Sequence, residues 1–475
     1  MGLLQTRTAT ALGAPVMMKG PAVVGPAPAR REPVSRDQLQ AEAVATLLRD
    51  RRLIVNWGTG TGKSRVAIQS VVRLLSEGKN RILLLVQETN HKGNWFREFT
   101  DCLGEAAGSD VFCSLTVECY ASLPKYEGTA WDFIIADEGH HLRSDNRTGV
   151  LATMRADYFL LLSATVSDRG DADVMLNTLE MTFGLFRKLD FSLQDSIDNG
   201  ILSIPKIYVH LLPLERLSEP QVITVEWGNP FARKHHEGSC SFEEYEYMNA
   251  NRDRWGTARL HVTCTPKQGY DTLTQFVDAA KRRCDDAQQR LVRAQRGGDP
   301  ATVKKAAMAA TMAKNEWLQF GLRRRNLLGA CKTLYAQWLL KQLGNKKYVC
   351  FCSDVEHGKI LGGDNIIYAD RKDNAQVIKA FDEDRIRSIF AIGMIQEGQN
   401  LRGIEAGVIV QLGGKERVFI QKFGRAMRSK MPEQHIIVVN DTRDVTYYRN
   451  AVANINPQYI RLIRVGERTD VGRTG

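Results

Sequence analysis

Leu53-Ile-Val-Asn-Trp-Gly-Thr-Gly-Thr-Gly-Lys-Ser64 joins an apolar strand, a glycine-rich turn and the start of a helix. Glycines lack a Cβ, so the backbone of such a turn can point successive N–H groups at one anion. The helix N-terminus adds a partial positive charge, Lys63 adds a cation, and the Ser64 hydroxyl is a ligand for Mg²⁺. The stretch therefore predicts a loop that binds the phosphates of a nucleoside triphosphate, formed by Thr59, Gly60, Thr61, Gly62, Lys63 and Ser64.

This phosphate loop departs from the strict pattern at one position, because Trp57 stands where that pattern has glycine. A glycine-rich turn can also be a plain connection between two elements. The setting favours the phosphate loop, since an apolar strand precedes it and an apolar helical pattern runs from Val66 to Leu75 and stops at Gly78.

The composition is that of a globular protein with two or three domains: 475 residues, 43% hydrophobic and 25% charged. No apolar run approaches the ~20 residues that a membrane span needs, so no membrane partner is expected. Nine scattered cysteines without a C-x-x-C pair suit a reducing compartment, and we expect a cytoplasmic protein. Residues 1–34 are rich in Ala, Gly, Pro and Val and predict a disordered tail.

A net charge of +11 favours a polyanionic partner, and the basic residues are concentrated in one region. Between Lys281 and Arg325 there are twelve Lys or Arg against four Asp or Glu. Helical apolar spacing on both sides of Gly297-Gly-Asp-Pro300 predicts a basic helical hairpin. Two interpretations remain open, namely a solvated charged face on an ordinary hairpin and an arm that contacts nucleic acid.

A second signature is Trp131-Asp-Phe-Ile-Ile-Ala-Asp-Glu-Gly-His140, an apolar strand followed by two carboxylates. In open parallel sheets, ligands bind at the carboxyl ends of the strands. Asp137 is expected to hold Mg²⁺, and Glu138 to orient and deprotonate the water that attacks the γ-phosphate. The same two residues could instead cap the next helix, but their combination with the phosphate loop favours the catalytic interpretation.

Asp137-Glu-Gly-His140 resembles the D-E-x-H box of superfamily 2 helicases and translocases, and other motifs follow in that family's order. The segment Gln38–Val44 resembles the adenine-reading glutamine region, with Gln38 or Gln40 as the reader and Gln40 preferred. Val86-Gln-Glu-Thr89 resembles a loop that contacts nucleic acid, which implies that role for Thr89. Ser163-Ala-Thr165 matches the S-A-T motif. The resemblance implies that Ser163 and Thr165 link the hydrolysis site, through His140, to movement on nucleic acid.

The second half of the chain carries further motifs of this family, between expected strands at 347–352, 388–392 and 408–412. Gln396-Glu-Gly-Gln-Asn-Leu401 resembles the E-G-x-[ND]-L loop, which implies nucleic-acid contacts for Gly398 and Asn400. Gln421-Lys-Phe-Gly-Arg-Ala-Met-Arg428 resembles Q-R-x-G-R-x-x-R, with Lys422 in place of the first Arg. Helical spacing places Gln421, Arg425 and Arg428 on one face, where the arginines would neutralise charge developing on the γ-phosphate.

The resemblance covers about residues 35–185 and 326–445 and implies an α/β fold of two tandem RecA-like parallel-sheet lobes with a mainly helical insertion. The expected layout is a first ATP-binding lobe, the insertion with the basic hairpin, a second lobe, and a C-terminal tail. Their residues are 35–214, 215–325, 326–450 and 451–475.

The function implied by this resemblance is an ATP- and Mg²⁺-dependent motor that moves on nucleic acid or unwinds it. DNA is favoured over RNA, because Asn94-Trp95 and Asn400-Leu401 resemble the SWI/SNF-like and DNA-repair-type branch. An RNA helicase is one alternative, and a nucleic-acid-binding module with a vestigial ATPase is another. A monomer is sufficient for the mechanism.

Overall fold

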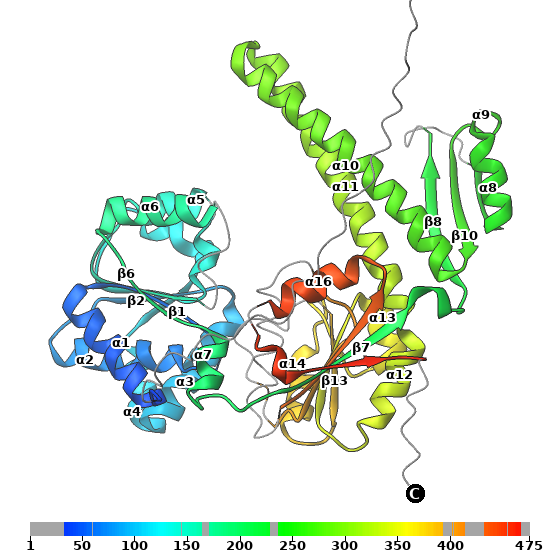
Figure 1. The fold of residues 1–475 in the computed structure, drawn as a ribbon. Coiled ribbons are helices and arrows are strands. Elements are labelled where there is room, and N and C mark those ends of the chain that lie inside the picture. Colours follow the sequence, from blue (N-terminus) through cyan, green and yellow to red (C-terminus); the bar gives the residue numbers. More distant parts are fainter. Residues whose placement is uncertain are drawn as a thin grey trace, which may run out of the picture.

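The computed structural model describes residues 33–58, 60–143, 145–163, 171–228, 236–392, 401, 403–413, 432–453 and 455–466. Two lobes, each a sheet covered by helices, lie side by side, and a long helical hairpin projects from the second lobe (Figure 1). Within the described ranges, no helix has both the length and the apolar character that crossing a bilayer requires.

The first lobe is built on a sheet with the strand order β3-β2-β4-β5-β1-β6, and its neighbouring strands run parallel. Its central strands are continuous apolar runs, as expected for a parallel sheet that is covered on both faces. The strands are β1 (Arg52–Trp57), β2 (Ile82–Val86), β3 (Thr116–Cys119), β4 (Ala130–Ala136), β5 (Arg155–Ser163) and β6 (Arg187–Phe191).

Helices cover both faces of this sheet. The first helix begins with a capping box, in which Ser35 and Gln38 exchange side-chain and backbone hydrogen bonds. The helices are α1 (Arg36–Asp50), α2 (Lys63–Ser76), α3 (Thr89–Leu103), α4 (Glu105–Cys113), α5 (Asp145–Leu151), α6 (Asp171–Phe183) and α7 (Leu193–Asp198), with 3₁₀ turns η1 (Tyr120–Tyr126) and η2 (Gly139–Arg143).

The second lobe has the strand order β12-β13-β11-β14-β15-β7-β16, again with parallel neighbours. Its strands are β7 (Lys206–Pro213), β11 (Tyr348–Cys352), β12 (Ile366–Ile367), β13 (Ser388–Ile392), β14 (Ala406–Ile409), β15 (Glu433–Asn440) and β16 (Ile460–Arg464). Its helices are α12 (Thr333–Gln342), α13 (Val355–Gly362), α14 (Asn374–Asp382) and α16 (Arg443–Val452), with the 3₁₀ turn η4 (Pro457–Tyr459). The predicted fold of two parallel-sheet lobes is confirmed.

Two strands of this second sheet come from segments that the sequence analysis assigned elsewhere. Strand β7 falls within 35–214, which was assigned to the first lobe, but it pairs with β15 and β16. Strand β16 falls within 451–475, which was assigned to a C-terminal tail. Pairing with strands far away along the chain decides the membership of both strands, and no local sequence pattern shows it.

The inserted region combines a small sheet with the predicted hairpin. The sheet has the order β8-β10-β9, with β8 antiparallel and β9 parallel to β10, and the sequence analysis did not foresee it. The hairpin breaks at Gly298-Asp299, where the Asp299 side chain caps the second helix by accepting from the N–H groups of Ala301 and Thr302. The elements are η3 (Leu214–Arg216), β8 (Gln221–Trp227), β9 (His236–Ser241), α8 (Phe242–Ala250), α9 (Arg252–Trp255), β10 (Ala258–Cys264), α10 (Pro266–Gly297) and α11 (Pro300–Ala330).

Candidate nucleotide and nucleic-acid site

Three neighbouring strands of the first sheet, β4, β5 and β1, bring the predicted motifs to one edge. Strand β4 ends just before Asp137, β5 ends at Ser163, and β1 leads into the phosphate loop. The register pairs Asn56 with Ser163 and Ala136 with Leu161. Because parallel strands share their carboxyl edge, the residues predicted to bind phosphate, hold metal and couple hydrolysis to movement lie together there.

The phosphate loop needs glycine at two described positions. Gly60 and Gly62 have φ values of 86° and 91°, in the left-handed region that glycine adopts without strain. Lys63 Nζ donates to the carbonyl oxygens of Trp57 (2.9 Å) and Gly58 (3.4 Å), and Thr61 Oγ1 donates to Gly58 O (2.8 Å). The ammonium therefore lies within the curl of the loop, while Thr59 lies outside the described residues.

The departure from the strict pattern at Trp57 has a structural explanation. Trp57 is the last residue of β1, and its indole is fully buried in the core of the first lobe. It packs edge-on against Phe191 of the neighbouring strand β6, with ring centroids 6.5 Å apart. The side chain therefore fills the core below the loop and leaves the phosphate-binding backbone uncovered.

The structure also distinguishes the two candidate adenine-reading glutamines. The Gln38 side chain accepts from the Ser35 N–H in the capping box of α1. Gln40 is buried, and its Nε2 donates to the carbonyl oxygen of Thr61 at 3.2 Å. A Cβ added at Gly62 would lie 2.1 Å from this Nε2, so Gln40 packs directly against the phosphate loop. The geometry favours Gln40, the residue preferred from the sequence.

The two carboxylates after β4 have different surroundings. Asp137 Oδ2 accepts a hydrogen bond from Trp95 Nε1 (2.8 Å), and the Asp137 carbonyl accepts one from Tyr120 Oη (2.6 Å). Glu138 has a φ of 48°, a costly value for a residue with a Cβ. Its Oε2 lies 3.4 Å from Nδ1 of the buried His140. The strained turn thus directs adjacent carboxylates to different partners.

The glycine of the Asp-Glu-Gly-His motif has a packing reason. A Cβ at Gly139 would lie 2.4 Å from Leu161 Cγ, closer than real Cβ atoms approach any heavy atom. The 3₁₀ turn that follows Glu138 therefore lies directly against strand β5. This close contact holds His140 beside Glu138.

Trp95 is a site residue whose role the sequence analysis missed. It lies on α3, is only 4% exposed, and places its indole N–H on the predicted metal-binding carboxylate. The signal available was Asn94-Trp95, which the sequence analysis used to indicate a branch of the superfamily and not a contact with Asp137. Helix α3 begins at Thr89, so one helix carries both the predicted nucleic-acid contact and a hydrogen bond to Asp137.

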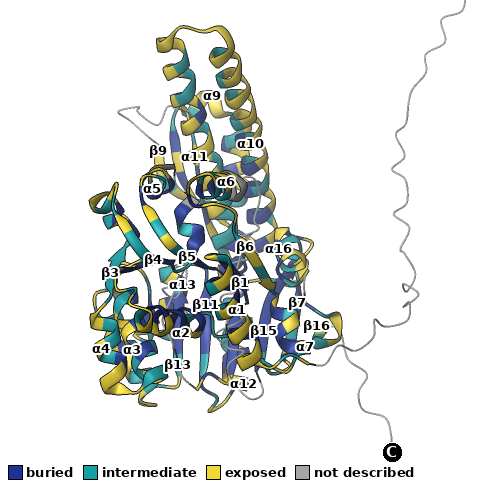
Figure 2. Cartoon of the chain, turned by 90° about the vertical axis from the view of Figure 1, so that its left-hand side faces the viewer, coloured by how far each residue is buried: buried dark blue, intermediate teal, exposed yellow. Residues whose placement is uncertain are grey.

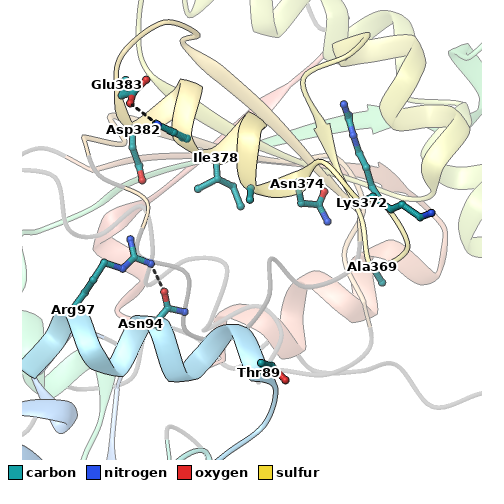
Figure 3. A pocket seen from close by; sticks show the side chains of 13 residues that line it. Thr89, Asn94, Arg97, Ala369, Lys372, Asn374, Ile378, Asp382 and Glu383 are labelled. Atoms are coloured by element: carbon teal, nitrogen blue, oxygen red, sulfur yellow. Dashed lines mark hydrogen bonds and ion pairs between the residues drawn. The ribbon is translucent and has the colours of Figure 1, made fainter. Parts of the chain in front are cut away.

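A cavity of about 760 Å³ lies between the lobes, and Thr89 lines it. From the first lobe come Thr89, Asn94 and Arg97 of α3, and Asn94 accepts a hydrogen bond from Arg97 (Figure 3). From the second lobe come α14 and the segment before it, including Lys372 and Asn374 (Figure 3). Cations and amides from both lobes thus face one space, together with the carboxylates of Asp382 and Glu383 (Figure 3). Cationic and amide side chains are the groups that contact a phosphodiester backbone.

Several predicted site residues lie outside the described part of the chain and remain predictions. These residues are Gly398 and Asn400 of the expected nucleic-acid loop, Thr165 of the S-A-T motif, and Gln421, Arg425 and Arg428 of the arginine face. The structure describes β14 before the arginine segment and β15 after it.

The described residues at the strand edge suit a nucleotide bound with Mg²⁺. Mg²⁺ prefers oxygen ligands, and two are available here. Ser64 is the second residue of α2, which follows β1, and Asp137 follows β4, two strands from β1 in the same sheet. The ammonium of Lys63 and the N-terminus of α2 supply positive charge for phosphates. The donors and acceptors present therefore match the chemistry of a metal-bound triphosphate.

Comparison with known proteins agrees with these motifs. Residues 34–168 match the family described as "Type III restriction enzyme, res subunit", which spans most of the first lobe. A relative, the DNA 3'-5' translocase XPB2 of Sulfurisphaera tokodaii, is 22% identical over 426 residues, covering 87% of this chain and 83% of its own length. With the motif order, these matches support the class that the sequence predicts, an ATP-hydrolysing helicase or translocase of superfamily 2.

Two solved structures give weaker likenesses. The Hef helicase domain of Pyrococcus furiosus has a TM-score of 0.41 and 11% identity, covering 87% of this chain and 96% of its own. The Type ISP restriction-modification enzyme LlaBIII bound to DNA has a TM-score of 0.49 and 11% identity, covering 94% of this chain and 32% of its own.

Proposed function

We propose that this protein is an ATP-dependent translocase that moves on DNA, of the DNA-repair-type branch of superfamily 2. The observation that carries the proposal is the joint position of Lys63, Asp137 and Ser163 at the carboxyl edge of three neighbouring strands. The choice of DNA is supported by the relative named a DNA translocase, which matches over most of both chains. The D-E-x-H box is then an Asp-Glu-Gly-His variant.

In this proposal each group at the strand edge has one task. The backbone N–H groups of the phosphate loop and Lys63 bind the β- and γ-phosphates of ATP, and Ser64 and Asp137 hold Mg²⁺. Glu138 orients the attacking water and accepts its proton, and the buried His140 beside it keeps the carboxylate in place. Gln40 reads the adenine next to the loop.

The second lobe completes the site in this mechanism. Arg425 and Arg428, with Gln421 on the same helical face, neutralise the charge that develops on the γ-phosphate oxygens. Because these groups belong to another lobe, hydrolysis requires the lobes to close, and product release lets them open. DNA held by Thr89 on one side and by Gly398 and Asn400 on the other is then displaced in each cycle. Ser163 and Thr165 connect the two events.

Two further features belong to the proposal. A monomer is sufficient, since one chain supplies both lobes. All nine cysteines lie in the described residues and none of them forms a disulfide, which suits a reducing cytoplasm.

The experiment that tests this function is ATP hydrolysis measured without polymer and with single-stranded DNA, duplex DNA or RNA. We expect DNA to stimulate hydrolysis, because lobe closure on the polymer assembles the site. Stimulation by RNA alone would instead indicate an RNA helicase. No stimulation by any polymer would favour a binding module with a vestigial ATPase. Glu138→Gln is the matched control, since it should bind ATP and fail to hydrolyse it.

A further inference from the structure

The base of the helical hairpin forms a hollow with α16 of the second lobe. Its volume is about 620 Å³, and residues of α10, α11 and α16 line it. The outer part of the hairpin is largely exposed, whereas burial increases towards this base (Figure 2). The residues on which the argument depends are Lys281, Trp317, Arg324, Arg325, Arg443 and Tyr447.

The hollow collects four cations, of which Lys281 pairs with Asp285 at 2.6 Å and three arginines have no carboxylate partner among the described residues. Arg324, Arg325 and Arg443 make no ion pair with any carboxylate of the described residues, although Asp278 also lines the hollow. Arg325 Nε is buried and has no hydrogen-bond partner in the described chain. Leaving a buried cationic donor unsatisfied is costly, so an anion from outside that reaches the hollow would be stabilised there.

Other arginines of the same hairpin are used differently. Arg283 on α10 pairs with Glu316 on α11 at 2.8 Å, which fastens the two helices together. Arg323, next to the hollow in sequence, lies 3.5 Å from Glu226 of strand β8 and faces the small sheet. The arginines of the hollow therefore differ from these neighbours in lacking a carboxylate, and hairpin stability does not explain their charges.

Aromatic rings lie among these cations. Lys281 Nζ lies 5.0 Å from the centroid of the Trp317 ring, and Arg443 Cζ lies 6.0 Å from that of Tyr447. Leu318 and Leu322, also in the lining, are 52% and 39% exposed. A surface for ions alone would have no use for these apolar groups. Rings and alkyl side chains next to arginines are what bases and phosphates of one strand require together.

The hollow is also firmly attached to the motor. The backbone N–H of Arg443 donates to Tyr270 Oη on α10 at 2.8 Å, which fixes the first residue of α16 to the hairpin. Arg324 Nη1 donates to Thr274 Oγ1 (3.3 Å), so the cation is held in position by the facing helix. Whatever the hollow binds moves with the second lobe.

We infer that this hollow binds single-stranded DNA, with Arg324, Arg325 and Arg443 on its phosphates and Trp317 stacked on a base. A duplex conceals its base faces and would leave Trp317, Leu318 and Leu322 in contact with water, so a single strand is the better fit. This site rests on the proposed function and extends it. The hollow would give the second lobe a contact with the DNA strand in addition to the cavity between the lobes.

The test is binding of fluorescent oligo-dT, without nucleotide and at two salt concentrations, to the full chain and its variants. We expect Trp317→Ala to weaken binding about tenfold, and Trp317→Phe to restore most of it because phenylalanine keeps a stacking face. Arg443→Gln should weaken binding about fivefold and reduce the slope of log affinity against log salt by about 0.7, the value for one phosphate contact on a single strand.

The matched control is Arg293→Gln, which removes one cation from the same hairpin. Arg293 lies twelve residues from Lys281 on α10, which is about 18 Å along the helix, and it should bind like the wild type. Equal melting temperatures would show that the variants fold. Unchanged binding by Trp317→Ala and Arg443→Gln, or an equal loss in Arg293→Gln, would overturn the inference.

Two further outcomes separate this site from the proposed function. Failure of DNA to stimulate ATP hydrolysis in the wild type counts against the proposed function, whereas the binding assay requires no hydrolysis. If DNA stimulates ATP hydrolysis by the wild type but the variants bind oligo-dT normally, the proposed function stands and only the binding site in the hollow is excluded. Loss of duplex binding as large as the loss of oligo-dT binding would overturn the assignment of a single strand.

Discussion

Lys63 in the first lobe and Lys332 in the second are the same residue type used in two opposite ways. Lys63 stands at the start of α2, half-buried, and donates to carbonyl oxygens of its own loop. Lys332 is fully buried, and its Nζ meets Asp444 Oδ2 (2.5 Å), Val410 O (2.8 Å) and Gln411 Oε1 (2.9 Å). The burial of a lysine ammonium and its hydrogen-bond partners therefore determine whether it is available to bind a ligand or stabilises the folded structure.

The partners of Lys332 show what it holds together. It lies between α11, which returns from the hairpin, and α12 of the second lobe. Its acceptors follow strand β14 or belong to α16, so one side chain connects three parts of the second lobe. Burial lowers the pKa of Lys332, and the Asp444 carboxylate opposes that change by stabilising the charged form. The pair is therefore a structural connection at the base of the hairpin.

Among the substitutions that test this comparison, Lys63→Ala is expected to have the largest effect, a loss of ATP turnover. Removing the cation that we propose contacts the β- and γ-phosphates should lower ATP turnover by about 10³-fold or more. The melting temperature should hardly change, because the side chain is half-buried and donates to carbonyl oxygens of its own loop. Steady-state ATPase and thermal unfolding measure the two outcomes. Full turnover in this variant would refute the phosphate-loop assignment.

Lys332→Ala should show the reverse pattern. It leaves the Asp444 carboxylate buried without its cation, a change that costs on the order of 3 kcal/mol in the free energy of unfolding. Denaturant unfolding measures this cost, and Lys341→Ala on the exposed face of α12 is the matched control, expected within about 0.5 kcal/mol of the wild type. A Lys332 variant as stable as the control would show that the buried pair does not hold the second lobe together.

The sequence predicts the site of Lys63 better than that of Lys332, for a physical reason. Phosphate binding needs glycine, lysine and hydroxyl groups at fixed spacing on one continuous segment, so the local sequence is sufficient to predict the loop. The partners of Lys332 come from segments about 80 and 110 residues further along the chain, and no local pattern links them. The membership of β7 and β16 in the second sheet escaped prediction for the same reason.

The contact between Trp95 and Asp137 shows the same limit within the site itself. The residues Asn94-Trp95 suggested a branch of the superfamily, but only the packing of α3 against the sheet reveals that the indole donates to Asp137, the carboxylate predicted to hold Mg²⁺. The residues that touch ligands are thus predictable from motifs, while the residues that position them are found from the fold.

Trp95→Phe should give the smallest of the three effects, and it tests whether this hydrogen bond matters for hydrolysis. The change keeps an aromatic ring in the core and removes the N–H that donates to Asp137 Oδ2. Losing one hydrogen bond to a carboxylate costs about 1.4 kcal/mol, which is about tenfold in the Mg²⁺ concentration that half-saturates ATP hydrolysis.

The matched control for this variant is Trp131→Phe, which removes an indole hydrogen bond to Thr129 Oγ1 (2.9 Å) at the opposite end of β4. Its Mg²⁺ dependence should equal that of the wild type. If Trp95 has only a structural role, Trp95→Phe should lower stability as Trp131→Phe does, and neither variant should change the Mg²⁺ dependence of hydrolysis. A shift confined to Trp95→Phe would instead identify the indole as the group that orients Asp137. It would also mean that α3, which begins at Thr89 beside the cavity between the lobes, can transmit polymer binding to the metal site.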